Sequence, residues 1–193
     1  MRETRRHLEF HIVAGSLKGK LIRSPDLGVT RAPLTRVRKS VFDFLNPYLA
    51  DARYLDLFSG TGSYLFEAVS RGVASATGVE LEPKLADAIN RQATEFGIAD
   101  RLVCLSDDVF KTVPALASAG KTFDIVMIAP PQYRRIIDET LALLKQHRVY
   151  TPDSLILCQH DTSERSKIEF QGFQILQQRK YGNTTFTILS EDS

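Results

Sequence analysis

One short segment constrains this chain more than any other: an apolar run that ends in an acidic residue and then turns through two glycines. Residues 54–62 read Tyr-Leu-Asp-Leu-Phe-Ser-Gly-Thr-Gly, and a second apolar run ends in Gly-Val-Glu at residues 78–80. A strand, a glycine turn, a helical stretch and a second strand together form a βαβ unit. Units of this kind bind a nucleoside beyond the carboxyl ends of their strands.

The rest of the chain from residue 53 extends this alternation of strands and helices. We expect strands at 54–58, 76–80, 102–105, 123–128 and 154–158, helices at 63–71, 83–96, 109–117 and 136–144, and a terminal strand pair at 173–179 and 184–189. Such a pattern is typical of an α/β fold, with a mostly parallel sheet, here of seven strands, and helices on both of its faces.

A basic extension precedes this α/β domain. It is predicted to contain a hairpin over 10–23 and a helix from Thr35 to about Asn46-Pro47. Residues 1–40 hold ten Lys and Arg against three acidic residues, an excess of +7 that leaves −5 for the remainder of a chain whose net charge is +2. We therefore divide the chain into an extension, 1–46, that contacts nucleic acid, and a main domain, 47–193.

Composition narrows the other possibilities. A length of 193 residues suits one domain with a sizeable core, and no apolar run is long enough for a signal peptide or a membrane span. Cys104 and Cys158 lie in strand-like runs and are expected to be buried thiols, with no metal-ligand spacing anywhere. His160 follows a strand and is expected to be a hydrogen-bonded structural residue. The cytoplasm is the expected compartment.

The glycine turn also discriminates between nucleoside ligands. Glu80 lies 18 residues after Gly62, where a carboxylate accepts hydrogen bonds from ribose hydroxyls. A nicotinamide dinucleotide requires a third glycine, but Ser63-Tyr64-Leu65 follows Gly62 and no other phosphate-binding pattern replaces it. Each piece alone is compatible with an ordinary turn or helix cap. Their joint spacing favours a nucleoside without phosphate, and S-adenosylmethionine is such a ligand.

At these residues the chain resembles the class I S-adenosylmethionine-dependent methyltransferases. It resembles more closely the bacterial family that methylates the exocyclic N2 of a guanine in small-subunit (16S) ribosomal RNA. The shared segments are 12–20, 36–42, 56–62, 67–72, 129–133 and 180–184. The resemblance implies a Rossmann-like class I methyltransferase fold, and a monomer that acts on 16S ribosomal RNA or on a small-subunit assembly particle.

The resemblance also implies roles for single residues. The methionine end of the cofactor is assigned to Asp56, Gly60 and Gly62, its ribose to Glu80, and its adenine amine to Asp108 or, alternatively, Asp107. Phe58, Leu81 and Val109 complete the expected cofactor-binding set. The expected contacts to RNA phosphates are Lys18, Lys20, Arg31, Arg36, Arg38 and Lys39, of which Arg36, Arg38 and Lys39 are predicted to present their charge outward from a helix.

The expected catalytic segment, Ala129-Pro130-Pro131-Gln132-Tyr133, departs from the family motif Asp/Asn-Pro-Pro-Tyr. An acceptor bonded to the guanine N–H helps to free the nitrogen lone pair, and Ala129 has no such side chain. The Pro130 carbonyl or the Gln132 amide would replace it, while Tyr133 would stack on a flipped base. If the missing acceptor limits the rate, an aspartate at position 129 should increase methyl transfer.

Three other functions compete with this one. An RNA-binding protein of weakened catalytic activity on the same fold is suggested by Ala129. A methyltransferase for amines of DNA or protein would use a related motif. A nicotinamide-dependent reductase is disfavoured because the third glycine is absent.

Overall fold

A seven-stranded, mostly parallel sheet forms the centre of the protein, as expected. The computed structural model describes residues 7–28, 35–131 and 136–191. The strand order is β5-β4-β3-β6-β7-β9-β8, and β9 alone runs antiparallel to its neighbours β7 and β8. The strands are β3 (Arg53–Asp56), β4 (Ser75–Glu80), β5 (Leu102–Ser106), β6 (Phe123–Ile128), β7 (Tyr150–Asp161), β8 (Gln174–Tyr181) and β9 (Thr184–Ser190).

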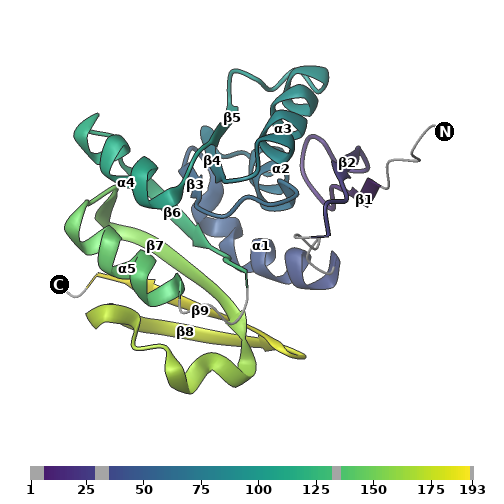
Figure 1. Ribbon diagram of the computed structural model, residues 1–193. Helices are drawn as coiled ribbons and strands as arrows, with labels where there is room; N and C mark the ends of the chain where they lie inside the picture. Colours follow the sequence, from purple (N-terminus) through teal and green to yellow (C-terminus); the bar gives the residue numbers. More distant parts are fainter. Residues whose placement is uncertain (1–6, 29–34, 132–135, 192–193) are drawn as a thin grey trace.

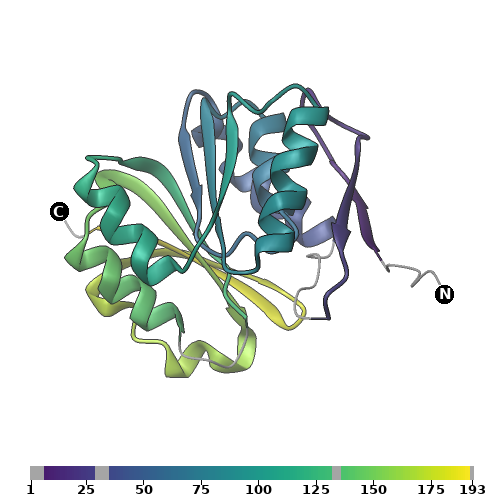
Figure 2. The same ribbon diagram turned by 45° about the horizontal axis from the view of Figure 1, so that its top comes forward.

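Helices cover both faces of this sheet (Figures 1 and 2). The helices are α1 (Thr35–Leu49), α2 (Ser63–Ser70), α3 (Pro83–Glu95), α4 (Val109–Ser118) and α5 (Ile136–Gln146), with short 3₁₀ turns at Thr162–Lys167 and Phe170–Gly172. Helices α1, α2 and α3 pack on one face in a first core cluster, and α4 and α5 on the other face in a second. Successive strand residues point to opposite faces, so Met127 joins the first cluster and Ile128 the second.

The strand order places a topological switch beside β3. The chain runs from β3 outward through β4 to β5, and then returns to place β6 on the other side of β3. The crevice beyond the carboxyl ends of such strands is the ligand site of open α/β sheets. Asp56, at the end of β3, and Ala129, directly after β6, therefore lie at this crevice.

The hairpin of the extension packs on the main domain. It pairs β1 (His7–His11) with β2 (Leu21–Pro25), so its first strand ends before the Ile12-Val13 pair that was expected to lead into the turn. Ile12 and Ile22 are buried in the first core cluster, and the Gln92 side chain of α3 bonds both the amide and the carbonyl of Arg23. The division into two parts at residue 46 stays a prediction.

Helix α1 differs from expectation at its end. It continues through Pro47 to Leu49, past the predicted end near Asn46-Pro47. A proline removes one backbone hydrogen bond from a helix. Leu45 and Leu49 are buried one helical turn apart, and their packing on the core keeps the last turn helical.

Several residues have the structural roles that the sequence indicated. Cys104 and Cys158 are buried free thiols. His160 is buried, with one ring nitrogen 2.8 Å from the Asp161 carbonyl oxygen and the other 3.0 Å from the Thr187 hydroxyl. Among the described residues, no helix is long and apolar enough to cross a membrane, and no group of metal-ligating side chains occurs.

Candidate functional site

The site begins with the turn between β3 and α2. Gly60 and Gly62 have φ angles of 52° and 76°, in the left-handed region that glycine adopts without strain. A Cβ atom at position 62 would also lie 2.7 Å from Ile89 Cγ1 on α3. Glycine is therefore required at position 62, and the turn brings backbone amides to the edge of the sheet.

Glu80, at the end of β4, is fixed against this turn. Its Oε2 accepts a hydrogen bond from the Gly60 amide at 2.7 Å, and its Oε1 accepts one from the Glu82 amide at 2.9 Å. The side chain is half-buried, and this burial raises the pKa of the carboxyl despite both bonds. Each oxygen retains a further lone pair, so the carboxylate can accept hydrogen bonds from two hydroxyl groups of a ligand.

Asp56 is the most unusual group at this edge. It is fully buried, its Oδ1 accepts a hydrogen bond from the Phe58 amide at 3.2 Å, and its Oδ2 has no partner in the described structure. Burial, opposed by that bond and aided by the charge of Glu80, raises the pKa of Asp56 from 3.8 to about 7. A buried acceptor without a donor is costly, so the site is suited to a ligand that brings a cationic donor.

These features fit S-adenosylmethionine. The unpaired Asp56 oxygen suits its amino group, and the anchored Glu80 carboxylate suits a ribose diol. Leu81, directly after Glu80, is 70% exposed, and it provides an apolar surface at the same strand end. Phe58 is half-buried beside Asp56. The residues present are therefore chemically consistent with this cofactor.

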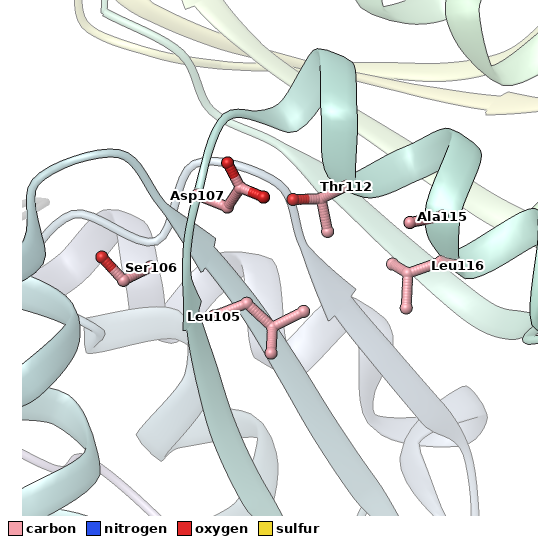
Figure 3. Close-up of a pocket in the computed structure, with 6 residues that line it drawn as sticks. All are labelled: Leu105, Ser106, Asp107, Thr112, Ala115 and Leu116. Atoms are coloured by element: carbon pink, nitrogen blue, oxygen red, sulfur yellow. The ribbon is translucent and has the colours of Figure 1, made fainter.

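A cavity of about 370 Å³ opens beyond the neighbouring strand end, between β5 and α4 (Figure 3). Its lining residues are Leu105, Ser106, Asp107, Thr112, Ala115 and Leu116. The Thr112 hydroxyl has no hydrogen-bond partner in the described structure, and the Asp107 carboxylate points toward it. Neither Asp56 nor Glu80 lines this cavity, and Asp107 is the one carboxylate among its lining residues.

The two candidate adenine ligands have different surroundings. Asp108 caps α4, because its Oδ1 accepts a hydrogen bond from the Phe110 amide at 2.8 Å. Asp107 accepts a hydrogen bond from the Asp108 amide at 2.7 Å and lines the cavity. Val109, the first residue of α4, is buried. The geometry leaves both carboxylates as alternatives for the adenine amine.

The predicted catalytic segment begins at the end of β6. Ala129 and Pro130 are half-buried and Pro131 is exposed, whereas Gln132 and Tyr133 lie outside the described residues. Ala129 packs against the first core cluster, which also contains Tyr64. The Tyr64 hydroxyl donates to Gln159 Oε1 at 2.7 Å. Sequence reasoning missed this pair, and no local signal marked it.

Most of the predicted RNA-contacting residues that the structure describes are exposed. Lys18, Lys20, Arg36 and Lys39 lie on the surface, and Arg31 lies outside the described residues. The Lys20 ammonium stands 4.6 Å from the Phe96 ring centroid, and the Lys39 ammonium contacts Asp43 at 2.5 Å. These cations are accessible to a polyanion.

The prediction for Arg38 is wrong. This side chain is fully buried, donates to the His11 carbonyl at 2.6 Å and lies 3.5 Å from Glu67 Oε2. Burial lowers the pKa of its guanidinium, which the Glu67 charge opposes. Residues 38, 42, 45 and 49 follow helical spacing, so Arg38 lies on the buried face of α1. Its contacts with His11 and Glu67 connect α1 to the hairpin and to α2.

Known proteins resemble this chain over most of its length. The model of the family described as conserved hypothetical protein 95 matches residues 10–190. "Ribosomal RNA small subunit methyltransferase D" of Escherichia coli K12 is 29% identical over 148 residues, which cover 77% of this chain and 73% of that protein.

Solved structures share the fold. One described as "Putative methyltransferase yhhF from Escherichia coli" gives a TM-score of 0.83 at 22% identity, over 96% of this chain and 99% of that one. An RNA methyltransferase from Salinibacter ruber in complex with S-adenosyl-L-homocysteine gives 0.65 at 15% identity, over 85% and 95%. The protein has the Rossmann-like class I methyltransferase fold, and it belongs to the family described as conserved hypothetical protein 95.

Proposed function

We propose that this protein transfers a methyl group from S-adenosylmethionine to the exocyclic N2 of a guanine in small-subunit (16S) ribosomal RNA. The observation that carries the proposal is the strand-end site, in which an unpaired buried Asp56 oxygen lies beside an anchored Glu80 carboxylate. A curated relative named as a small-subunit ribosomal RNA methyltransferase supports the choice of reaction and of RNA.

The methionine end, the ribose and the adenine of the cofactor would each contact residues at the end of a different strand. Asp56 would accept a hydrogen bond from the amino group, and the Gly60–Gly62 turn would let backbone amides approach the methionine moiety. Glu80 would accept from the ribose hydroxyls. Phe58 and Leu81 would contact the nucleoside, Val109 would contact the adenine, and either Asp107 or Asp108 would accept from the adenine amine.

When bound, S-adenosylmethionine supplies the methyl group on a sulfonium, an excellent leaving group. The protein therefore contributes mainly by positioning the nucleophile. Consecutive prolines at 130 and 131 restrict the backbone, so the Pro130 carbonyl would be held ready to accept from the guanine N–H. Gln132 is the alternative acceptor, and Tyr133 would stack on the flipped base.

The exposed cations of the extension, Lys18, Lys20, Arg36 and Lys39, would hold RNA phosphates, together with Arg31. Arg38 is excluded from this set because it is buried. We propose a monomer that acts on the RNA or on a small-subunit assembly particle. Its place of action would be the cytoplasm, where bacterial ribosomal subunits assemble.

The direct test measures transfer of labelled methyl to 16S RNA, and to small-subunit particles, from cells that lack this protein. Label should appear as N2-methylguanosine after nuclease digestion. Glu80→Gln should weaken binding of S-adenosylmethionine and reduce transfer, whereas exposed Glu95→Gln, at the end of α3, should change neither. Failure to label either substrate, with the cofactor bound, would contradict the proposal.

The same experiment separates the two remaining candidates. A catalytically weakened RNA-binding protein, which Ala129 suggests, would bind both RNA and cofactor without transfer. An amine methyltransferase for DNA or protein would label those substrates in competition with the RNA.

A further inference from the structure

Gln159 occupies the place next to Ala129 at the substrate edge of the sheet. Strands β6 and β7 are parallel and pair Ile128 with Cys158, so Ala129 is opposite Gln159 in the next position. Met127 and Leu157 belong to the first core cluster, while Ile128 and Cys158 belong to the second. By the two-residue period of a strand, the side chains at 129 and 159 share the face on which Tyr64 lies.

Tyr64 is hydrogen-bonded to the oxygen of this amide. Its hydroxyl donates to Gln159 Oε1 at 2.7 Å, and its ring lies 6.0 Å from that of Phe42 and 6.4 Å from that of Phe186. Burial raises the pKa of Tyr64, so the hydroxyl keeps its proton throughout the physiological range. In the structure the amide oxygen faces Tyr64, which leaves the amide nitrogen available to a different acceptor.

We propose that Gln159, oriented by Tyr64, is a specificity-determining residue that donates a hydrogen bond from its amide nitrogen to O6 of the target guanine. The inference rests on the proposed function, because it requires a purine presented at Ala129. Guanine carries an acceptor at position 6, whereas adenine carries an amine there. An outward-facing donor therefore accepts guanine and opposes adenine.

The alanine at position 129 is consistent with this role. A carboxylate or amide at 129 would stand directly beside Gln159, since the two positions are adjacent across parallel strands. The methyl side chain of Ala129 has no polar group that could bond the Gln159 amide, and Gln159 is only half-buried. Recognition of the base edge would thus come from β7, while the Pro130 carbonyl remains available for the reacting amine.

The test uses an altered base that keeps the reacting amine, carries an amine in place of O6 and lacks the N1 proton, so that the comparison between protein variants isolates the part due to Gln159. The methylated guanine is first located by mass spectrometry in RNA treated with the wild-type protein. It is then replaced by 2,6-diaminopurine in ligated RNA. The wild-type protein should prefer guanine to 2,6-diaminopurine by about tenfold or more in kcat/KM. With the altered base, the Gln159 amide loses one hydrogen bond and its N–H group faces the N–H group of the 6-amine.

Gln159→Glu provides the decisive comparison. Glutamate still accepts from Tyr64 but presents an oxygen in place of the amide nitrogen, so the preference should invert toward 2,6-diaminopurine. Tyr64→Phe frees the amide to rotate, and it should reduce the guanine preference to about threefold or less. Gln177→Glu, an exposed amide on β8, is the matched control and should leave the ratio unchanged.

The possible outcomes separate this inference from the proposed function. A wild-type ratio in Gln159→Glu would overturn the role of Gln159, and so would an unchanged ratio in Tyr64→Phe if the first variant does not fold. Wild-type protein that methylates no guanine at all would instead contradict the proposed function.

Discussion

Glu67 joins helix α1, helix α2 and the hairpin loop in one buried charge cluster. On α2, it accepts hydrogen bonds from the backbone amides of Val13 at 3.0 Å and Ala14 at 3.2 Å, and from Arg71 Nε at 2.9 Å. Arg38 Nε on α1 lies 3.5 Å from its second oxygen. The side chains of Glu67 and Arg38 are fully buried, and that of Arg71 is 6% exposed. The loop of the hairpin is thereby held to α2.

Glu67→Gln tests the energy stored in this cluster. Each oxygen of the Glu67 carboxylate faces one backbone amide and one arginine Nε. In the variant one of these oxygens is replaced by an NH₂ group, whose protons would point at two other N–H groups. The variant also leaves two buried guanidinium groups without their shared anion. Disrupting a buried ion pair in this way costs about 3–5 kcal/mol. Against a total stability of about 5–15 kcal/mol, that loss removes a large part of the free energy of unfolding.

Urea unfolding of the wild-type and variant proteins measures this loss, with unchanged slopes to confirm that the unfolding reaction is the same. The exposed pair of Glu9 and Arg23 supplies the control. The Glu9→Gln variant should lose no more than about 1 kcal/mol, because such surface pairs contribute little. A loss below about 1 kcal/mol in Glu67→Gln would refute the reasoning.

Three further predictions concern the site and the extension. Under the proposed role, the carboxylate form of Asp56 binds the cofactor amino group. Affinity for S-adenosylmethionine should then rise up to about tenfold per pH unit until about pH 7, and calorimetry of Asp56→Asn should show no such pH dependence. Without cofactor, the raised pKa means that Asp56 holds its proton more tightly in the folded protein than in the unfolded chain. The free energy of unfolding should therefore decrease as the pH rises from about 4 to about 7. Ala129→Asp should increase the rate of methyl transfer to RNA if a missing acceptor limits it, and an unchanged rate in the folded variant would count against that idea. Arg36→Ala should weaken RNA binding and lower its salt dependence by about one phosphate contact, with cofactor affinity unchanged; loss of cofactor binding would instead assign Arg36 to the fold.

The sequence was most informative where a role depends on neighbours in the chain. The glycine turn and Glu80 follow from strand, turn and acid spacing within one βαβ unit. The unpaired oxygen of Asp56 did not follow, since it depends on what surrounds the strand end in space. Gln159 was likewise hidden, because its partner Tyr64 is 95 residues away in sequence.

Arg38 shows a different kind of error. Its helical spacing with Phe42, Leu45 and Leu49 was present in the sequence, but its charge outweighed that spacing in the prediction. A buried arginine is tolerated because it forms an ion pair with Glu67 and donates a hydrogen bond to the His11 carbonyl. Neither partner is marked by sequence proximity, so charge alone suggested a surface contact that the packing excludes.

Helix α2 begins at the glycine turn after β3 and ends beside the hairpin loop, and all eight of its residues are buried. A helix with one exposed face tolerates substitution at every third or fourth position, as α1 should with its exposed Arg36, Lys39 and Asp43. Helix α2 has no such face. In a complete substitution scan it should form an unbroken block of intolerance from Ser63 to Ser70, and natural variation should enter this segment only through paired changes in the elements that enclose it.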